Sequence, residues 1–316
     1  LSNNFQYIST NRFIGSNTTS SNSLDRYYSN YNYLRIAYGV TNKLTVSVEG
    51  GYYLNKTEIG LNASDTIIGR GISDLILFPR YNVLHKLNDK GSIDITVGTG
   101  LKFPLGRFND SLAWIEPFSG NTYYFLKPPA VQRSTGAQDF IFYASVFKGF
   151  SENKFRVFAN GLYIRKGWNP LGEKAGNYSS ASLFAGKTVL KNAGITLQLK
   201  AEHIQPLQLN NDLFEMGFYN YDTKSSGSTK LFFIPQLSYS FKSFSASLSD
   251  ELPLYQFVNG TQMASQHQFN FSVTYRFFPF TKKVESGIYY CPMHPDQTST
   301  KPGSCPICHM DLVEKK

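Results

Sequence analysis

Apolar and polar residues alternate with a period of two along most of residues 1–278. Residues 28–38 are typical, because Leu34, Ile36 and Tyr38 would lie on one face of an extended chain and Tyr33 and Arg35 on the other. Alternation bounded by turn residues predicts β-strands with one apolar and one polar face. It predicts about twelve strands, over residues 4–13, 28–38, 44–53, 72–83, 93–105, 139–150, 154–168, 179–190, 194–207, 230–241, 244–257 and 266–278.

The predicted connections alternate in length. The short ones span residues 39–43, 85–91, 151–153, 191–193 and 242–243, and the long ones span 14–27, 53–70, 106–138, 169–178, 208–228 and 258–265. Bacterial outer-membrane barrels have an even number of antiparallel strands, short periplasmic turns and longer external loops. We therefore predict an all-β fold, a transmembrane antiparallel β-barrel of about twelve strands in the bacterial outer membrane, with both termini in the periplasm.

Alternation alone also fits a secreted or periplasmic all-β domain, in which the apolar face meets a core instead of lipid. Predicted strands of ten or more residues exceed the usual ~5–6 and favour the membrane. The last segment alternates Phe269, Phe271, Val273, Tyr275 and Phe277 with polar residues, which resembles the assembly signal of outer-membrane proteins. Aromatic pairs near expected strand ends suggest interfacial girdles, namely Tyr27 with Tyr28, Tyr52 with Tyr53, Tyr123 with Tyr124 and Phe277 with Phe278.

Composition supports this picture and narrows the partners. Aromatic residues make up 16% and charged residues 17% of the chain, against about 25% charged in ordinary soluble domains. The net charge of +9 is spread along the sequence without a dense basic run, so we expect outer-membrane lipid and no nucleic acid as a partner. No apolar run reaches the roughly 18–20 residues of a transmembrane helix. The chain begins at Leu1 without a leader, and we expect that a signal peptide has been removed.

The polar faces of the predicted strands would line the barrel interior. Two interpretations remain open: a network of salt bridges that plugs the barrel, or the polar wall of a channel, since about twelve strands enclose more space than side chains of an eight-stranded barrel fill. The long segment 106–138 could fold inward as a constriction. The expected inward charges are Arg35, Glu49, Asp74, Arg80, Asp94, Lys102, Arg156, Lys200, Glu202 and Arg276.

Several short motifs in the barrel region resemble one family. They are Gly39-Val40-Thr41-Asn42-Lys43-Leu44, Gly71-Ile72-Ser73-Asp74-Leu75, Gly100-Leu101-Lys102-Phe103-Pro104-Leu105-Gly106, Pro253-Leu254-Tyr255-Gln256 and Asn259-Gly260-Thr261-Gln262. They are similar to stretches of the outer-membrane family named for the MetA pathway of phenol degradation. The resemblance implies a twelve-stranded outer-membrane barrel, often called a transporter, and supplies no functional residues.

The end of the chain has a different chemistry. All three cysteines lie there, and two residues separate Cys291 from His294 and Cys305 from Cys308. Two-residue spacing lets both side chains of a knuckle reach one ion, and three thiolates with one imidazole complete a tetrahedral site. Metal binding would supply the folding free energy that so small a module lacks. We predict a barrel over residues 1–279, a polar linker over 280–287 and a periplasmic metal-binding module over 288–316.

The tail also resembles the heavy-metal-binding domain attached to copper and silver efflux adaptors and metal-pumping ATPases. The matching residues are Tyr289, Cys291-Pro292-Met293-His294-Pro295, and Pro302-Gly303-Ser304-Cys305-Pro306-Ile307-Cys308-His309-Met310-Asp311-Leu312. The resemblance implies that Cys291, His294, Cys305 and Cys308 are the metal ligands, with Met293 and Met310 as candidate soft ligands. His309 stands where the family usually has Gly and offers a further ligand.

These observations predict one soft metal ion, either Zn²⁺ or Cu⁺/Ag⁺, because Cys and His suit Zn²⁺ and added thioethers favour Cu⁺ or Ag⁺. The two Met residues could instead fill a small core, and two cysteines could form a disulfide. A catalytic metal needs an open position and a base, and Asp311 is the only carboxylate directly beside the second knuckle, so we expect no enzyme.

The leading hypothesis is an outer-membrane barrel that binds soft metals in metal transport, efflux or homeostasis, with periplasmic metal-efflux or chaperone proteins as partners. A second hypothesis is a passive pore for small solutes, aromatic ones included, with a structural zinc clip. A third is a plugged barrel that serves as a scaffold in a membrane complex.

Overall fold

The computed structural model describes residues 1–15, 24–88, 91–150, 154–190, 192–210 and 223–277, and in the tail residues 289–291, 293–294, 297–299, 303–305, 307–308 and 310–314. The chain divides into two compact units, Leu1–Tyr275 and Arg276–Lys316. The predicted linker 280–287 lies outside the described residues, so the proposed domain boundaries stay a prediction. Among the described residues, no helix is long and apolar enough to cross a membrane.

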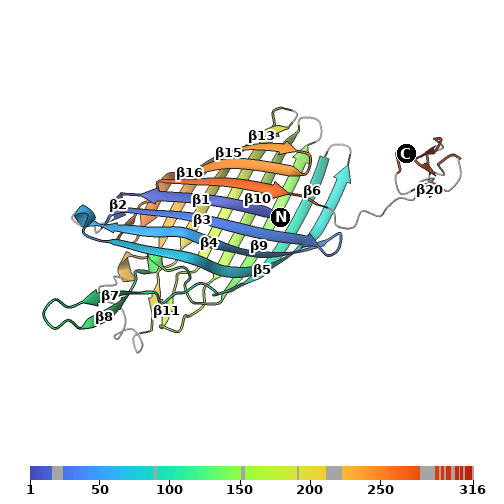
Figure 1. The fold of residues 1–316 in the computed structure, drawn as a ribbon. Coiled ribbons are helices and arrows are strands. Elements are labelled where there is room, and N and C mark those ends of the chain that lie inside the picture. The colour runs from blue at the N-terminus through green and yellow to red at the C-terminus, as the bar shows by residue number, and fades with distance from the viewer. Residues whose placement is uncertain are drawn as a thin grey trace. The chain divides into compact units, whose positions relative to one another are not determined.

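The first unit is a closed antiparallel β-barrel of twelve strands (Figure 1), as predicted. Each strand pairs with the next barrel strand in sequence, and β1 closes the ring against β18. The barrel strands are β1 (Ser2–Thr10), β3 (Leu24–Gly39), β4 (Leu44–Gly60), β5 (Thr66–Asn88), β6 (Gly91–Phe103), β9 (Asp139–Phe150), β10 (Phe155–Arg165), β12 (Tyr178–Thr188), β13 (Ala193–Ile204), β15 (Ser228–Phe241), β16 (Phe244–Val258) and β18 (His267–Tyr275).

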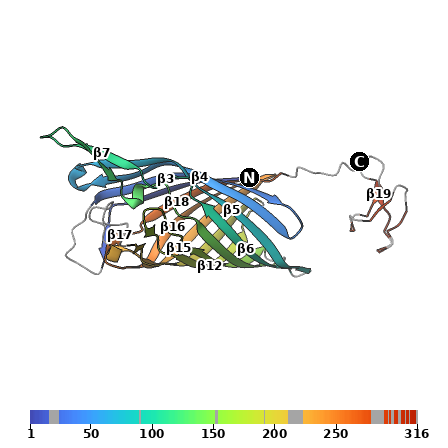
Figure 2. The same cartoon turned by 90° about the horizontal axis from the view of Figure 1, so that it is seen from below.

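Short turns lie at one end of the barrel, together with Leu1, whose amino group donates to the carbonyl oxygen of Tyr275 at 2.9 Å. The connections at the other end carry small additional elements, and Figures 1 and 2 show β7 there, away from the N-terminus. These elements are β2 (Phe13–Gly15) paired with β17 (Thr261–Met263), β7 (Ser111–Ile115) with β8 (Thr122–Leu126), β11 (Glu173–Lys174) with β14 (Gln208–Leu209), and the 3₁₀ turns η1 (Leu61–Ala63), η2 (Pro129–Val131) and η3 (Thr223–Ser225).

The apolar face of the strands points outward. Leu34, Ile36 and Tyr38 on β3 are 40%, 48% and 47% exposed, and on the last strand Phe269 and Phe271 are 44% and 48% exposed. Exposed apolar residues thus recur at every second position around the outside of the barrel, which is the arrangement of a lipid-facing band. The predicted alternation of faces on these strands is confirmed.

Charged side chains of the inner face form ion pairs. Arg35 Nε lies 2.7 Å from Glu49 Oε1, and the Glu49 side chain is only 4% exposed. Lys102 Nζ lies 2.7 Å from Asp74 Oδ2 and 3.0 Å from Asp139 Oδ2. Inward-facing charges therefore largely compensate each other within the wall.

The prediction that Arg276 faces the barrel interior is wrong, because β18 ends at Tyr275 and Arg276 is exposed in the second unit.

The prediction of a loop over residues 53–70 is also wrong. β4 continues to Gly60 and β5 begins at Thr66, and the two pair from Tyr53 opposite Gly71 to Ile59 opposite Thr66. Register shifts between Gly50 and Tyr52 and between Tyr53 and Lys56 interrupt the pairing. After a bulge, each side chain points to the face opposite to the one that strict alternation predicts. For that reason the strict period of two in the sequence ends near residue 53.

The aromatic girdles are only partly as expected. Tyr123 and Tyr124 belong to β8, in a hairpin outside the barrel strands, and Tyr53 lies in the middle of β4, where its ring stacks on Tyr31 at 4.4 Å. Phe277 follows the last strand, and Phe278 lies outside the described residues. Clusters of aromatic residues in sequence do not separate strand ends from strand interiors, since both environments favour them.

The connection between β6 and β9 folds against the inner wall, as the sequence suggested. Val131 is fully buried, and Lys56 Nζ donates to the carbonyl oxygen of Gln132 at 2.6 Å. Lys102 Nζ also donates to Thr135 Oγ1 at 2.9 Å. Gly69 permits this approach, because a Cβ there would lie 1.9 Å from the Val131 carbonyl oxygen. Segment 129–135 therefore constricts the barrel on the side of β4 to β6.

Candidate metal centre

The second unit is organised by a small three-stranded sheet. β19 (Tyr289–Tyr290) pairs with β20 (Thr298–Ser299) on one side and with β21 (Val313–Glu314) on the other. The segment between β19 and β20 carries Cys291 and His294, and the segment between β20 and β21 carries Cys305 and Cys308. The sheet thus fixes the bases of two loops that together carry all four predicted ligands.

Backbone hydrogen bonds close each loop tightly. In the first, Cys291 N donates to Gln297 O at 3.1 Å and Gln297 N donates to His294 O at 2.8 Å. In the second, Cys305 N donates to Met310 O at 2.8 Å, and Ser304 forms a β-bridge with Asp311. Turns of this kind hold two side chains that are separated by two residues on the same side of the backbone.

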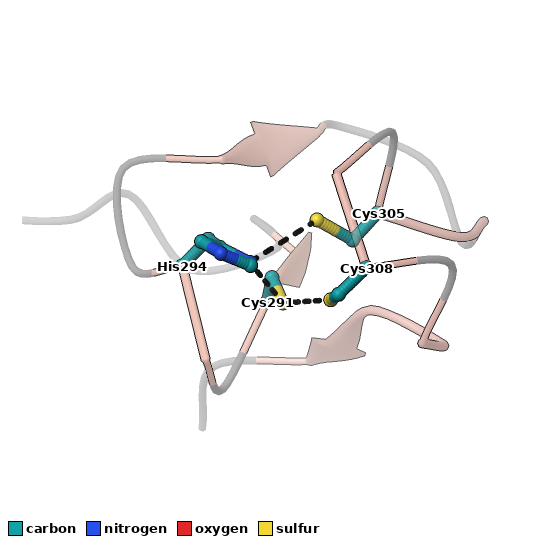
Figure 3. A group of neighbouring side chains, drawn as sticks. All are labelled: Cys291, His294, Cys305 and Cys308. Atoms are coloured by element: carbon teal, nitrogen blue, oxygen red, sulfur yellow. Dashed lines mark hydrogen bonds between the residues drawn. The ribbon is translucent and has the colours of Figure 1, made fainter. Parts of the chain in front are cut away.

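The four predicted residues converge (Figure 3). Their ligand atoms, three Sγ and one imidazole nitrogen, all lie within 4.8 Å of one another. His294 Nδ1 is 3.8 Å from both Cys291 Sγ and Cys305 Sγ, and Cys291 Sγ is 3.4 Å from Cys308 Sγ. Cys291 and Cys305 are fully buried, and all three cysteines are free thiols.

These separations fit a tetrahedral ion. Thiolates bound at about 2.3 Å and imidazole nitrogens at about 2.0–2.1 Å place neighbouring ligand atoms about 3.5–3.8 Å apart at tetrahedral angles. The observed spacings of 3.4 and 3.8 Å lie close to this range, whereas a disulfide needs about 2.05 Å. The donor set is soft and leaves space for one ion at its centre, so these residues fit the predicted metal.

The backbone also prepares one sulfur as a thiolate. Burial raises the pKa of Cys305, but the backbone N–H groups of Cys308 and Ile307 and the neighbouring thiols outweigh it and lower that pKa to about 6. For Cys308 the backbone N–H of Met310 lowers the pKa, and burial together with the Cys291 and Cys305 thiols raises it more strongly. The unequal pair supplies one ready thiolate and one thiol that a metal ion must deprotonate.

The additional candidates lie differently. Met293 and Met310 are 65% and 43% exposed, so the interpretation that they fill a small core is wrong. Their role as soft ligands stays a prediction. His309 lies outside the described residues. The sequence did not predict the backbone N–H groups that face the Cys305 sulfur, because every residue except proline has such a group and residue types do not show where it points.

Residues 288–315 match the family model of the heavy metal binding domain. The tail is similar to that family. The match covers the second unit only and says nothing of the barrel. No curated protein matches the chain.

The barrel is similar to solved outer-membrane proteins. A crystal structure of an outer membrane channel from Pseudomonas putida F1 superposes with a TM-score of 0.61 at 15% identity, covering 87% of this chain and 94% of that one. The NanC porin gives a TM-score of 0.45 at 11% identity, covering 88% of this chain and 100% of that one. The KdgM porin in complex with disordered oligogalacturonate gives 0.41 at 9% identity, with coverages of 88% and 100%. At 15% identity, the likeness to the Pseudomonas putida F1 protein shows the fold alone, a closed β-barrel of the outer-membrane type.

Proposed function

We propose that this chain is an outer-membrane barrel protein that binds one soft heavy-metal ion through Cys291, His294, Cys305 and Cys308. The observation that carries the proposal is the convergence of four ligand atoms within 4.8 Å, in a tail similar to the heavy metal binding domain. Tetrahedral thiolate–imidazole sets of this kind bind Zn²⁺, and they bind soft monovalent ions when thioethers are added. The exposed thioethers of Met293 and Met310 favour Cu⁺ or Ag⁺ as transferable ions.

We further propose that the module occupies the periplasm. The last barrel strand ends at Tyr275, at the end of the barrel that carries the short turns. Short turns lie on the periplasmic side of outer-membrane barrels. The barrel would extend over residues 1–279, the linker over 280–287 and the module over 288–316, and the barrel would be of the type named for the MetA pathway.

The proposed role is non-enzymatic and lies in metal transport, efflux or homeostasis. A Cys308 sulfur that is only partly buried, with exposed Met293 and Met310 nearby in sequence, leaves a soft surface through which an ion can be exchanged. Periplasmic metal-efflux or chaperone proteins are the proposed exchange partners, and outer-membrane lipid surrounds the barrel.

A second candidate is a passive pore with a structural zinc clip. The fold of a channel, with its TM-score of 0.61 to a solved channel, favours this alternative over a closed scaffold. In that case zinc would be held permanently, and its loss would unfold the tail without altering metal tolerance. The two candidates differ in their effect on cells. In the first, metal tolerance depends on the ion site of the tail, and in the second only passage of solutes through the barrel matters.

Metal tolerance of cells separates them. Cells that carry the Cys305→Ser/Cys308→Ser variant instead of the native chain are expected to lose tolerance to copper or silver, because soft cations lose their thiolate ligands. The Ser304→Ala variant, which changes an exposed neighbour, is the matched control. Unchanged tolerance, with equal amounts of protein in the membrane, would favour the structural zinc clip.

A further inference from the structure

The inner face of the barrel has two sides of different chemistry. On β4 to β9 several inward side chains are charged or large and closely packed: Glu49, Phe78, Lys102 and Ile141 are 4%, 8%, 8% and 6% exposed, and Asp139 is fully buried. On this same side segment 129–135 lies against the wall, where it contacts Lys56 and Lys102.

On β15, β16 and β18 the inward side chains toward the short-turn end are small, neutral and polar, whereas Phe232 and Ile234, farther along β15, are large and 4% and 5% exposed. The register places Ser247 opposite both Ser238 and Ser272, and Ser249 opposite both Gln236 and Asn270. All are partly exposed, unlike the packed opposite wall. We call this set the hydroxyl stripe: Gln236, Ser238, Ser247, Ser249, Asn270 and Ser272.

The stripe continues onto β1 through side-chain hydrogen bonds. Gln6 Nε2 donates to Asn270 Oδ1 at 3.3 Å, and the hydroxyl oxygens of Ser2 and Thr274 lie 3.0 Å apart. Hydroxyl and amide groups both donate and accept, so a solute that passes along them can exchange its hydrogen bonds with water for equivalent ones. Serine also leaves more of the lumen open than the Phe and Ile residues of the opposite wall do.

A cavity of about 240 Å³ lies toward the long-connection end of the same side. Its lining includes Glu251 and Gln268, which lie two residues beyond Ser249 on β16 and two residues before Asn270 on β18. The cavity is therefore the direct continuation of the stripe along these strands. At about 30 Å³ per water molecule it holds about eight waters, the size of a small polyol or a pentose.

The charges at this cavity compensate each other. Lys200 Nζ lies 2.5 Å from Glu251 Oε2 and 3.6 Å from Glu202 Oε2, and Lys230 Nζ donates to Ser265 Oγ at 2.9 Å. Two lysines thus face two glutamates. A group of this kind presents donors and acceptors to a solute without selecting either sign of charge.

We propose that the barrel has an off-centre permeation route for small hydrophilic solutes without net charge. The route begins at the cavity lined by Lys200, Glu202 and Glu251 and follows the hydroxyl stripe. The route rests on the proposed membrane location of the barrel but not on metal binding by the tail. Segment 129–135 closes the other side of the mouth, so the cavity side is where a solute can enter.

Swelling of liposomes that contain the full-length protein tests the route, with arabinose as the solute. The Ser247→Leu/Ser272→Leu variant is expected to slow swelling at least ~5-fold, because pore width and the lining groups set permeation. The matched control is Thr45→Leu/Thr96→Leu, which replaces two inward hydroxyls on β4 and β6 and should stay within about 2-fold of wild type. Heat-modifiable migration in gels verifies that each barrel is folded.

A second variant tests the cavity by itself. Lys200→Met leaves Glu202 and Glu251 without their shared cation, so the reversal potential in a potassium chloride gradient should shift toward potassium selectivity. Absence of arabinose-dependent swelling in wild type, equal slowing by both double variants, or an unchanged reversal potential in Lys200→Met would each overturn the proposal. None of these outcomes bears on metal binding by the tail.

Discussion

Cys291 Sγ and Cys308 Sγ lie 3.4 Å apart, although 17 positions separate the two residues in the sequence. The distance is too long for a disulfide and close to that of two thiolates sharing one ion. His294 Nδ1, at 3.8 Å from Cys291 Sγ and from Cys305 Sγ, completes the set. The arrangement therefore fits one ion held between the four side chains and does not fit a disulfide.

Cobalt provides an optical test of this geometry. Co²⁺ added to the reduced, metal-free full-length protein should give the strong visible absorption of tetrahedral coordination and a thiolate charge-transfer band, because Co²⁺ accepts the ligands of Zn²⁺. Cys308→Ser should weaken Co²⁺ binding about 10–100-fold or more, and Ser304→Ala should not. A weak octahedral spectrum in the wild type would contradict the tetrahedral site.

Metal affinity should rise with pH. The backbone N–H groups lower the pKa of Cys305 to about 6 in spite of its burial, so this sulfur is mostly thiolate at neutral pH. The pKa of Cys308 is raised, so its proton must leave when the metal binds. Affinity should fall as pH drops through neutrality, and more steeply below about pH 6, where Cys305 also takes up a proton.

Calorimetric titration with Zn²⁺ in two buffers of equal pH and different ionisation enthalpy measures the protons released. Wild type at neutral pH should release about one proton or more per ion, and Cys308→Ser should release fewer. Affinity that does not change between about pH 6 and 8 would contradict protonated thiols in the metal-free site.

Much of the fold was readable from the sequence because the barrel wall is one layer thick. Each strand has one lipid-facing and one inward face, so alternation such as Leu34, Ile36 and Tyr38 against Tyr33 and Arg35 is retained in the fold. The prediction failed where that layer is irregular. Bulges near Gly50 and Tyr53 shift the alternation of inward and outward side chains. The hairpin of β7 and β8 is a separate sheet and does not belong to the barrel wall.

The convergence of the four tail residues was predictable for a related reason. A knuckle places its two ligands by local spacing, so Cys291 with His294 and Cys305 with Cys308 are visible without knowledge of the fold. Inward charges whose partners lie far away in the sequence are less visible. Asp139 and Glu251 pair with Lys102 and Lys200, yet both escaped the sequence prediction, because each partner is far from it along the chain and only the strand arrangement brings the two together.

The ion pairs around Lys102 should stabilise the constricted side of the barrel. Lys102 Nζ contacts Asp74 and Asp139, whose side chains are 13% and 0% exposed. Lys102→Met would remove the cation from Asp74, while Asp139 would keep Lys166 Nζ at 2.9 Å. The substitution should lower the free energy of unfolding by about 3–5 kcal/mol, measured by urea unfolding of the folded barrel in lipid. Arg107→Ala, at a 75% exposed residue 3.9 Å from Asp110, should cost at most about 1 kcal/mol. Equal losses of unfolding free energy in the two variants would show that the buried ion pairs stabilise the barrel no more than the exposed pair does.

Gly69 should be needed for segment 129–135 to lie against the wall. A Cβ at this position would meet the Val131 carbonyl oxygen at 1.9 Å, whereas at Gly161 the nearest atom would be 4.0 Å away. Gly69→Ala is expected to destabilise the barrel by about 1–3 kcal/mol and to expose connection 104–138 to limited proteolysis, and Gly161→Ala should do neither. Identical digestion patterns would mean that the segment does not depend on this close approach.

The most direct test of the central claim is elemental analysis of the full-length protein, purified under reducing conditions, beside the Cys305→Ser/Cys308→Ser variant. We expect one soft metal ion per wild-type chain, copper, silver or zinc, and its loss from the variant, because the four ligand atoms of the tail lie together in one cluster. A wild-type chain without stoichiometric metal, or a variant that retains as much metal as the wild type, would contradict it.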